Sequence, residues 1–324
     1  MNLSKTALVT HRACMDGSAC VILFLALGGK QENVFYSDPG ANKVDRVVKR
    51  ALLELAGPIM IADVAISEQL ADELDDTERA VVLLDHHRNS VPLNRFDWCE
   101  IEVDNQRCGS MMLYEQLERT LRKEIANLHE HAFAHPGDPR TQLTRLLEYR
   151  SLIQLVDVRD RWVVDGDPAA QTISTFHIVI GQKLFVERFF KKPTTFLFNE
   201  EKYLVDMVER KKVDYIEKVK KHIRIVDTES GGVKIRVAFM MANDHQSELG
   251  YSVTHDPDLD VDIAVMVGSF SVALRSHEDC PVDLSQLARL NDPHGGGHRC
   301  ASGFSLSRVL DGEIIDIVKE KMRF

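Results

Sequence analysis

The chain has 324 residues, enough for two globular domains, and its 44% hydrophobic and 28% charged residues are ordinary for a folded protein. Its formal net charge of −10 argues against a protein that tracks long nucleic acids, because non-specific affinity comes mainly from basic residues that contact phosphates. The longest apolar run, from Ala19 to Leu27, is too short to cross a bilayer, so we expect no membrane partner.

The six cysteines show neither a CxxC pair nor the density of a small secreted domain. The N-terminal residues also lack the basic segment and long apolar core of a signal peptide. We therefore expect reduced thiols and a cytoplasmic location.

Strand-like and helix-like segments alternate in the first part of the chain. We expect strands at 6–10, 33–36, 58–62 and 80–84, and helices at 17–27, 43–56 and 67–74. Longer helical patterns follow at 110–131, with Ser110 as the N-cap, and at 141–156. This alternation predicts an α/β fold with a parallel sheet covered by helices on both faces.

A charged helical pattern at 200–221 separates this part from the rest of the chain. Beyond it, the residues alternate at 233–238, are strand-rich at 262–274 and form a short helical pattern at 285–290. We expect a catalytic α/β domain at 1–190, a connecting helix at 191–222 and a smaller α/β domain at 223–324. Substrate is expected to bind between the two domains, since domain interfaces favour such sites.

Three of the expected strands end in residues that can bind metals. The residues at these ends are His11 with Asp16 just beyond it, then Asp63, then Asp85, His86 and His87. Ligands in open α/β sheets bind beyond the carboxyl ends of the strands, so these side chains should converge. Imidazoles mixed with carboxylates suit divalent first-row metals, and the weight of oxygen favours Mn²⁺. A single aspartate at a strand end is more often a cap, so the prediction depends on all three ends together.

These residues resemble the motifs of the DHH phosphoesterase family, in the branch that carries a C-terminal DHHA1 domain. Residues 84–87 (LDHH) match the motif that names the family, and residues 11–17 resemble the HxxCxDG first motif of short-oligonucleotide hydrolases. Asp63 matches the second motif, and residues 156–162, which end in Trp162, resemble the fourth. The DHHA1 signature is resembled by residues 274–276 and 295–299, so the resemblance covers nearly the whole chain.

The resemblance implies an N-terminal DHH domain that holds two Mn²⁺ ions, with other divalent metals as alternatives. Asp63 would bridge the two ions and His11 would bind one of them. The ligands implied for the other ion are Asp16, His86 and an aspartate of the fourth motif. We expect that aspartate to be Asp160, because its spacing to Trp162 fits better, with Asp157 as its close rival.

Three further residues near this centre have implied or open roles. Asp85 would orient His86, as carboxylates commonly do for metal-bound imidazoles, and His87 would face the substrate phosphate. Cys14 stands where many family members carry the first aspartate of a DxD motif. It is either a thiolate ligand that favours softer metals or a bystander.

The candidate substrate-binding residues lie near the end of the chain. Gly295, Gly296 and Gly297 lack Cβ atoms, so their N–H groups can approach an anion and form a concave nest. The other candidates, which offer charge-assisted or hydroxyl donors, are His298, Arg299, Arg275 and Ser276. A glycine-rich turn and an ordinary surface arginine are the plainer interpretations.

Together these features predict a metal-dependent hydrolase that cleaves very short 5′-phosphorylated oligoribonucleotides, or linear dinucleotides such as pGpG, to mononucleotides. Within the same family, a 3′,5′-bisphosphonucleoside phosphatase, a cyclic-nucleotide phosphodiesterase and a single-strand exonuclease are alternatives. Because Cys14 leaves the first motif incomplete, a nucleotide-sensing binding protein without catalysis is a further alternative. A homodimer is an assembly that the sequence leaves open.

Overall fold

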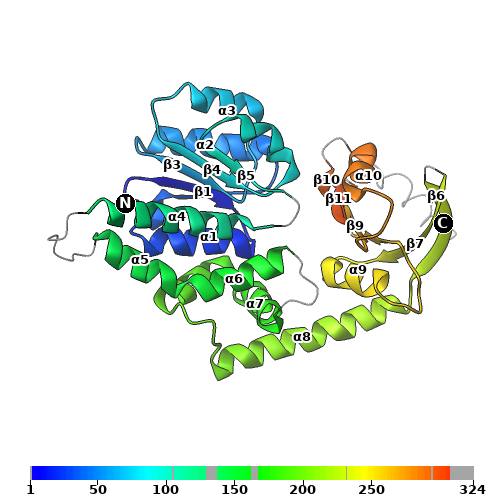
Figure 1. Ribbon diagram of the computed structural model, residues 1–324. Coiled ribbons are helices and arrows are strands. Elements are labelled where there is room, and N and C mark those ends of the chain that lie inside the picture. The colour runs from blue at the N-terminus through cyan, green and yellow to red at the C-terminus, as the bar shows by residue number, and fades with distance from the viewer. Residues whose placement is uncertain are drawn as a thin grey trace, which may run out of the picture. The chain divides into compact units, whose positions relative to one another are not determined.

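A computed structural model describes residues 2–103, 106–128, 137–161, 167–230, 232–292 and 295–306. The chain divides into two compact units, residues 1–208 and 209–324 (Figure 1). Within the described residues, no helix combines the length and the apolar composition that crossing a bilayer would require.

The first unit is built on a parallel sheet of five strands in the order β2-β1-β3-β4-β5. The strands are β1 (Ala7–His11), β2 (Val34–Ser37), β3 (Ile59–Ala62), β4 (Val81–Asp85) and β5 (Cys99–Ile101). The pleat sends Ile61 and Leu83 into the core on one face, and Met60 and Leu84 into the core on the other. A central strand that is buried on both faces has a continuous run of apolar residues in the sequence, so such strands can be predicted from the sequence.

Helices cover both faces of this sheet, as predicted. On one face lie α2 (Ala41–Glu54) and α3 (Glu68–Asp75). On the other face lie α1 (Met15–Ala26), α4 (Gly109–Ala126), α5 (Pro139–Glu148), α6 (Arg150–Asp160) and α7 (Pro168–Lys191) (Figure 1). Short 3₁₀ segments at Gln31–Asn33 and Arg88–Arg95 complete the unit. Because α1 packs between β1 on one side and α6 and α7 on the other, nearly all its residues are buried.

Two helical features of the first unit differ from the predictions. The pattern at 141–156 forms two helices, α5 and α6, which meet at Tyr149. The Tyr149 ring is fully buried and its hydroxyl donates to the Phe190 carbonyl oxygen at 3.1 Å, so the chain turns where this side chain enters the core. The sequence analysis missed α7, which is largely apolar and has no clear polar face. Its start is nevertheless marked by Asp167 as N-cap followed by Pro168.

The second unit is a mixed α/β unit, which agrees with the predicted fold class. Its six-stranded sheet has the order β10-β11-β9-β8-β7-β6, in which only β7 and β8 run parallel. The strands are β6 (Arg224–Ser230), β7 (Val233–Met241), β8 (Ile263–Val267), β9 (Ser271–Ser276), β10 (Gly296–His298) and β11 (Ala301–Ser305). Helix α8 (Asn199–Lys220) leads into this unit, and α9 (Gln246–Thr254) and α10 (Leu284–Asn291) pack on opposite faces of its sheet.

Candidate metal centre

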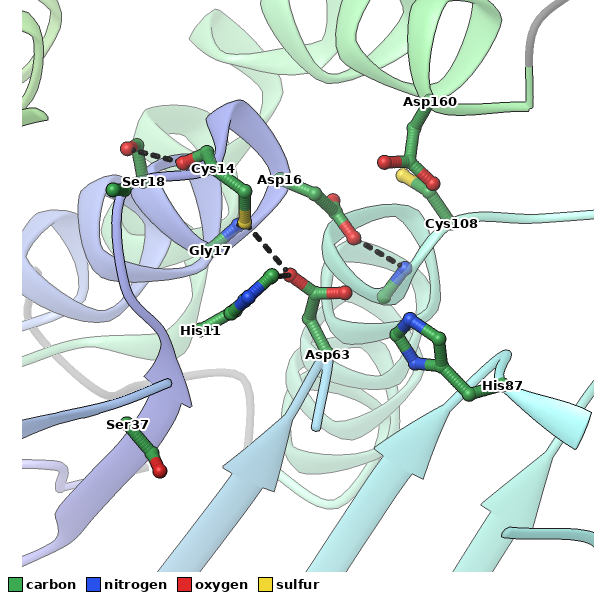
Figure 2. A network of polar contacts seen from close by, with 12 residues as sticks. His11, Cys14, Asp16, Gly17, Ser18, Ser37, Asp63, His87, Cys108 and Asp160 are labelled. Atoms are coloured by element: carbon green, nitrogen blue, oxygen red, sulfur yellow. Dashed lines mark hydrogen bonds and ion pairs between the residues drawn. The ribbon is translucent and has the colours of Figure 1, made fainter. Parts of the chain in front are cut away.

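Asp63 is the central residue of the site. It follows β3 with φ of 62°, a left-handed conformation that aspartate tolerates better than most side chains, and it is 3% exposed. Its Oδ2 lies 3.7 Å from His11 Nδ1 and accepts a hydrogen bond from Cys14 Sγ at 3.1 Å. Its Oδ1 lies 3.3 Å from His86 Nε2. Figure 2 shows one oxygen of Asp63 directed toward His11 and Cys14. The two oxygens of this buried carboxylate therefore contact different groups, His11 and Cys14 on one side and His86 on the other.

A second group of possible metal ligands consists of Asp16, His86 and Asp160. One ligand atom from each of these residues lies within 4.8 Å of the others, and the same holds for His11, Cys14 and Asp63. Asp160 is the last residue of α6, and its Oδ2 lies 3.5 Å from His86 Nε2. The structure thus brings together the metal-binding candidates of the first, second, third and fourth motifs.

Several acidic groups lie close together here, of which Asp16 and Asp63 are buried and Asp160 is exposed. Burial raises the pKa of Asp16 to about 8, and the negative charges of Asp63 and Asp160 add to the increase. Burial by itself lowers the pKa of His86, but its hydrogen bond with Asp63 and the charge of Asp160 raise that pKa to about 10. A divalent cation would stabilise such crowded carboxylates, and imidazole with carboxylate oxygen is a donor set that first-row metals accept. The residues present therefore fit a divalent metal.

Asp85 holds the ring of His87. Its Oδ1 lies 2.7 Å from His87 Nδ1, and its Oδ2 accepts a hydrogen bond from the Ser90 hydroxyl. Its hydrogen bond with His86 is to the backbone N–H, at 3.0 Å. The imidazole ring that Asp85 contacts at 2.7 Å is thus that of His87, and the orientation of the His86 ring by Asp85 stays a prediction. Burial lowers the pKa of His87, but the Asp85 carboxylate outweighs it and raises that pKa to about 9.

The two aspartates of the fourth motif have different surroundings. Asp157 accepts hydrogen bonds from the Cys108 N–H at 2.8 Å and from Arg161 Nε at 2.9 Å, so both of its oxygens bind other parts of the protein. Asp160 instead lies with His86 and Asp16. The geometry thus favours Asp160 as the ligand candidate, while Trp162 of the same motif lies outside the described residues.

Cys14 has two roles in the local structure. It is the N-cap of α1, where its sulfur accepts a hydrogen bond from the Gly17 N–H at 3.0 Å, and it donates to Asp63. Burial, with the charges of Asp63 and Asp16, raises the pKa of this thiol well above its usual range. Gly17 is required beside it, because a Cβ there would lie 2.3 Å from the His11 carbonyl oxygen.

The N-terminus of α4 is capped by aspartates from other helices. The N-cap position belongs to Cys108, so the prediction of Ser110 is wrong. Asp16 accepts hydrogen bonds from the N–H groups of Gly109 and Ser110, both at 2.8 Å, and Asp157 accepts from Cys108. These N–H groups have no partner inside the helix, and the helix dipole favours negative charge beside them.

Gly109 is a site residue that the sequence analysis missed. A Cβ at this position would lie 2.8 Å from Asp63 Cβ and 2.9 Å from Asp63 Cα. Only glycine therefore lets α4 begin directly against Asp63. The sequence signal was slight, since a glycine near a predicted helix start is common.

In the second unit, Arg275 and His298 share one face of the sheet. Arg275 on β9 pairs with Ala301 on β11, and Ala301 pairs with His298 on β10. Side chains of directly paired residues point to the same face, so Arg275 and His298 flank the small side chain of Ala301. Arg275 Nη2 donates to Ser247 Oγ at 2.8 Å, and its side chain packs so closely on Gly250 that a Cβ there would clash.

The other C-terminal candidates are engaged within the protein. The Gly295 N–H donates to the Asp292 carbonyl oxygen at 2.7 Å, and residues 296–298 form strand β10 in a hairpin with β11. Gly296 and Gly297 are therefore part of a β ladder, and Gly295 lies directly before it, so the predicted concave nest is not the local structure of these glycines. Arg299 Nη2 donates a hydrogen bond to the Cys280 carbonyl oxygen at 2.6 Å. The Ser276 N–H donates to the Cys300 carbonyl oxygen at 3.0 Å.

Comparisons with known proteins identify relatives of this fold. No family model matches the chain. The oligoribonuclease NrnB of Bacillus subtilis (strain 168) is 27% identical over 311 residues, which cover 90% of this chain and 71% of that protein. Among solved structures, a DHH domain of a protein described as a member of the s1p family of ribosomal proteins has a TM-score of 0.54 at 14% identity, covering 99% of this chain and 87% of that one. The exonuclease RecJ bound to manganese has a TM-score of 0.50 at 14% identity, covering 98% and 90%.

The chain resembles the DHH/DHHA1 proteins in its motifs, which occur in the expected order, and its first unit has the fold of a DHH domain. The motif Asp85-His86-His87 contributes His86 to the cluster of candidate metal ligands, and Asp85 forms the hydrogen bond that fixes the ring of His87.

A first prediction concerns Gly109. Gly109→Ala should destabilise the protein by about 1–3 kcal/mol, since the methyl group must displace Asp63 or the start of α4. It should also weaken binding of Mn²⁺, because Asp16 and Asp63 both touch Gly109. Thermal unfolding and calorimetric titration with Mn²⁺ measure the two effects.

Gly296→Ala is the matched control for stability, because a Cβ at Gly296 would meet no atom within 4 Å. Equal unfolding temperatures for Gly109→Ala and the wild type would contradict the close approach described above.

Proposed function

We propose that this protein is a divalent-metal-dependent phosphodiesterase of the DHH type that hydrolyses very short 5′-phosphorylated oligoribonucleotides to mononucleotides. The observation that carries the proposal is Asp63, a single buried carboxylate whose two oxygens face two separate donor sets. A carboxylate placed in this way suits a bridge between two metal ions. Proteins that hold such pairs commonly hydrolyse phosphate esters.

The proposed roles of the side chains follow from their places. His11 and Cys14 lie with one oxygen of Asp63, and Asp16, His86 and Asp160 are the set on the other side. The bound metals would supply an activated water and would stabilise charge on the phosphate. His87, with its Nδ1 hydrogen-bonded to Asp85, would direct its other ring nitrogen to a phosphate oxygen of the substrate.

Three observations support a short substrate. The 27% identical relative is an oligoribonuclease. The net charge of −10 is poorly suited to a long polyanion. The second unit instead has Arg275 and His298 on one sheet face, on either side of Ala301, where they would bind the terminal phosphate of the substrate. We propose Mn²⁺ as the metal, because the donors combine imidazole with several carboxylates.

The test of this function is product analysis with Mn²⁺ on a panel of substrates. The panel contains pGpG, a longer single-stranded RNA, a 3′,5′-bisphosphorylated nucleoside and a cyclic dinucleotide. With pGpG we expect water to add to the bridging phosphorus and the bond to the 3′-oxygen to break, giving two molecules of the 5′-mononucleotide. Preferred cleavage of another member would instead support an exonuclease, a nucleoside phosphatase or a cyclic-nucleotide phosphodiesterase.

Asp63→Asn is the inactive reference for this panel, because asparagine keeps the shape and tolerates the left-handed backbone. Turnover should fall to background with saturating Mn²⁺. Asp97→Asn, the same change at an exposed position, should behave as the wild type. Binding of pGpG by the wild type without turnover would favour the nucleotide-sensing alternative.

A further prediction separates the two roles of Cys14. Both Cys14→Ser and Cys14→Asp keep an N-cap for α1, so the fold should be retained. If the sulfur is a ligand, Cys14→Ser should weaken one of two binding events, and Cys14→Asp should shift the preference toward harder ions such as Mg²⁺. Titrations with Mn²⁺, Mg²⁺ and Zn²⁺ measure this. Identical titrations for both variants and the wild type would make Cys14 a bystander.

The second unit should mainly affect substrate affinity. Arg275→Met removes a charged group and His298→Ala removes an imidazole donor, and each should raise KM for pGpG by about 30-fold, as expected for the loss of a contact to a terminal phosphate. The effect on kcat should be smaller if the contact is equal in the ground and transition states. Steady-state kinetics on pGpG, beside a small phosphodiester without a terminal phosphate, measure this.

The small phosphodiester should be hydrolysed almost normally by both variants. Arg236→Met, at a largely exposed arginine of the same unit, is the control. Equal losses on the two substrates would show that Arg275 and His298 serve the fold or the chemistry.

A further inference from the structure

The turn at residues 11–14 carries two of the candidate ligands and has a strained backbone. His11 ends β1, Cys14 begins α1 as its N-cap, and Ala13 between them has φ of 59°. A left-handed alanine is uncommon and persists only where the surroundings hold it. The orientation of His11 and Cys14 toward Asp63 therefore depends on what fixes this turn.

Gln182 of α7 holds the turn with both ends of its amide. Its Oε1 accepts a hydrogen bond from the Ala13 N–H at 3.1 Å, and its Nε2 lies 3.4 Å from the His11 carbonyl oxygen, to which it donates. The turn and Gln182 are about 170 residues apart in the sequence. One side chain thus satisfies a backbone donor and a backbone acceptor on either side of the turn.

A second contact from α7 fixes the end of the same turn. The Ser18 hydroxyl donates to the Cys14 carbonyl oxygen at 2.7 Å. Its single proton is then used, so His177 Nε2, which lies 2.9 Å away, must be the donor to the Ser18 oxygen. His177 is buried beside the ring of Phe185 and is therefore held in place.

Gly181 allows both contacts to come from one helix. In an unbroken α-helix, His177 and Gln182 would point about 140° apart and could not both reach this turn. Gly181 has φ of 75° and ψ of 162°, which interrupts α7 between them. This conformation is readily adopted by glycine and strained for other residues.

We propose that Gln182 and His177 are positioning residues, which hold the 11–14 turn so that His11 and Cys14 face Asp63 Oδ2. This inference rests on the proposed metal-dependent function, and it concerns only the metal site on the His11 side of Asp63. The site formed by Asp16, His86 and Asp160 is held by other contacts, chiefly those at the start of α4.

The first test uses the full chain without metal. Gln182→Met keeps the size of the side chain and removes both hydrogen bonds, so the Ala13 amide should exchange its proton faster by about tenfold. Gln182→Glu keeps the acceptor for that amide and should restore protection. Gln171→Met, the same change at a half-buried position of α7, should leave exchange at Ala13 unchanged. Hydrogen exchange followed at residues 11–18 measures this, and thermal unfolding checks that each variant is folded.

The second test is calorimetric titration with Mn²⁺. Gln182→Met should weaken one binding event by about tenfold, as for other groups that orient metal ligands, and leave the other unchanged. The weakened event should be the one that His11→Ala abolishes. His177→Phe, which keeps the ring and its packing but not the hydrogen bond, should have the same effect in weaker form.

The outcomes separate this inference from the proposed function. Unchanged Ala13 exchange and Mn²⁺ affinity in a folded Gln182→Met variant would overturn the inference and leave the function standing. Binding of Mn²⁺ by the wild type without hydrolysis of any substrate would overturn the function and leave the inference standing. Absence of Mn²⁺ binding by the wild type would overturn both.

Discussion

The start of α4, with the carboxylates around it, is the interaction on which the candidate centre depends. Asp16 from α1 and Asp157 from α6 accept hydrogen bonds from the first N–H groups of α4, and Gly109 brings this helix against Asp63. Burial of carboxylates is costly unless donors or cations compensate for it. The helix terminus provides part of that compensation, and the remaining charge makes the cluster a place for a divalent metal.

The register of the sheet explains why distant motifs meet. Thr10 pairs with Ala62, and Ala62 pairs with Leu84, so β1, β3 and β4 end at the same level. The residues that follow these three partners are the candidates His11, Asp63 and Asp85. The carboxyl ends of parallel strands lie at the same edge of the sheet. Because these three strands also end at the same register, their motifs lie next to one another along that edge.

The second unit has a different chemical character. It contributes no residue to the donor clusters found among the described residues, and its candidate contacts are an arginine and a histidine on one sheet face. In a chain with a net charge of −10, the Arg275 guanidinium on this face is a local positive charge. Under the proposed function, affinity and chemistry would belong to different units of the protein.

The sequence by itself determined strands β1 to β4 of the first unit, the candidate ligands at strand ends and the motifs of the resemblance. It did not predict the short, partly buried strand β5. Each feature that it determined is a short, local pattern: an apolar run and the residues directly after it. The tertiary structure decided what holds those ligands. The contacts of Gly109 and Gln182, and the position of Asp160 beside His86 and Asp16, appear only when distant segments meet. Asp16 and Gly109 are 93 residues apart, and Ala13 and Gln182 are 169 apart. Such contacts depend on packing between elements, and no local pattern of residues encodes them.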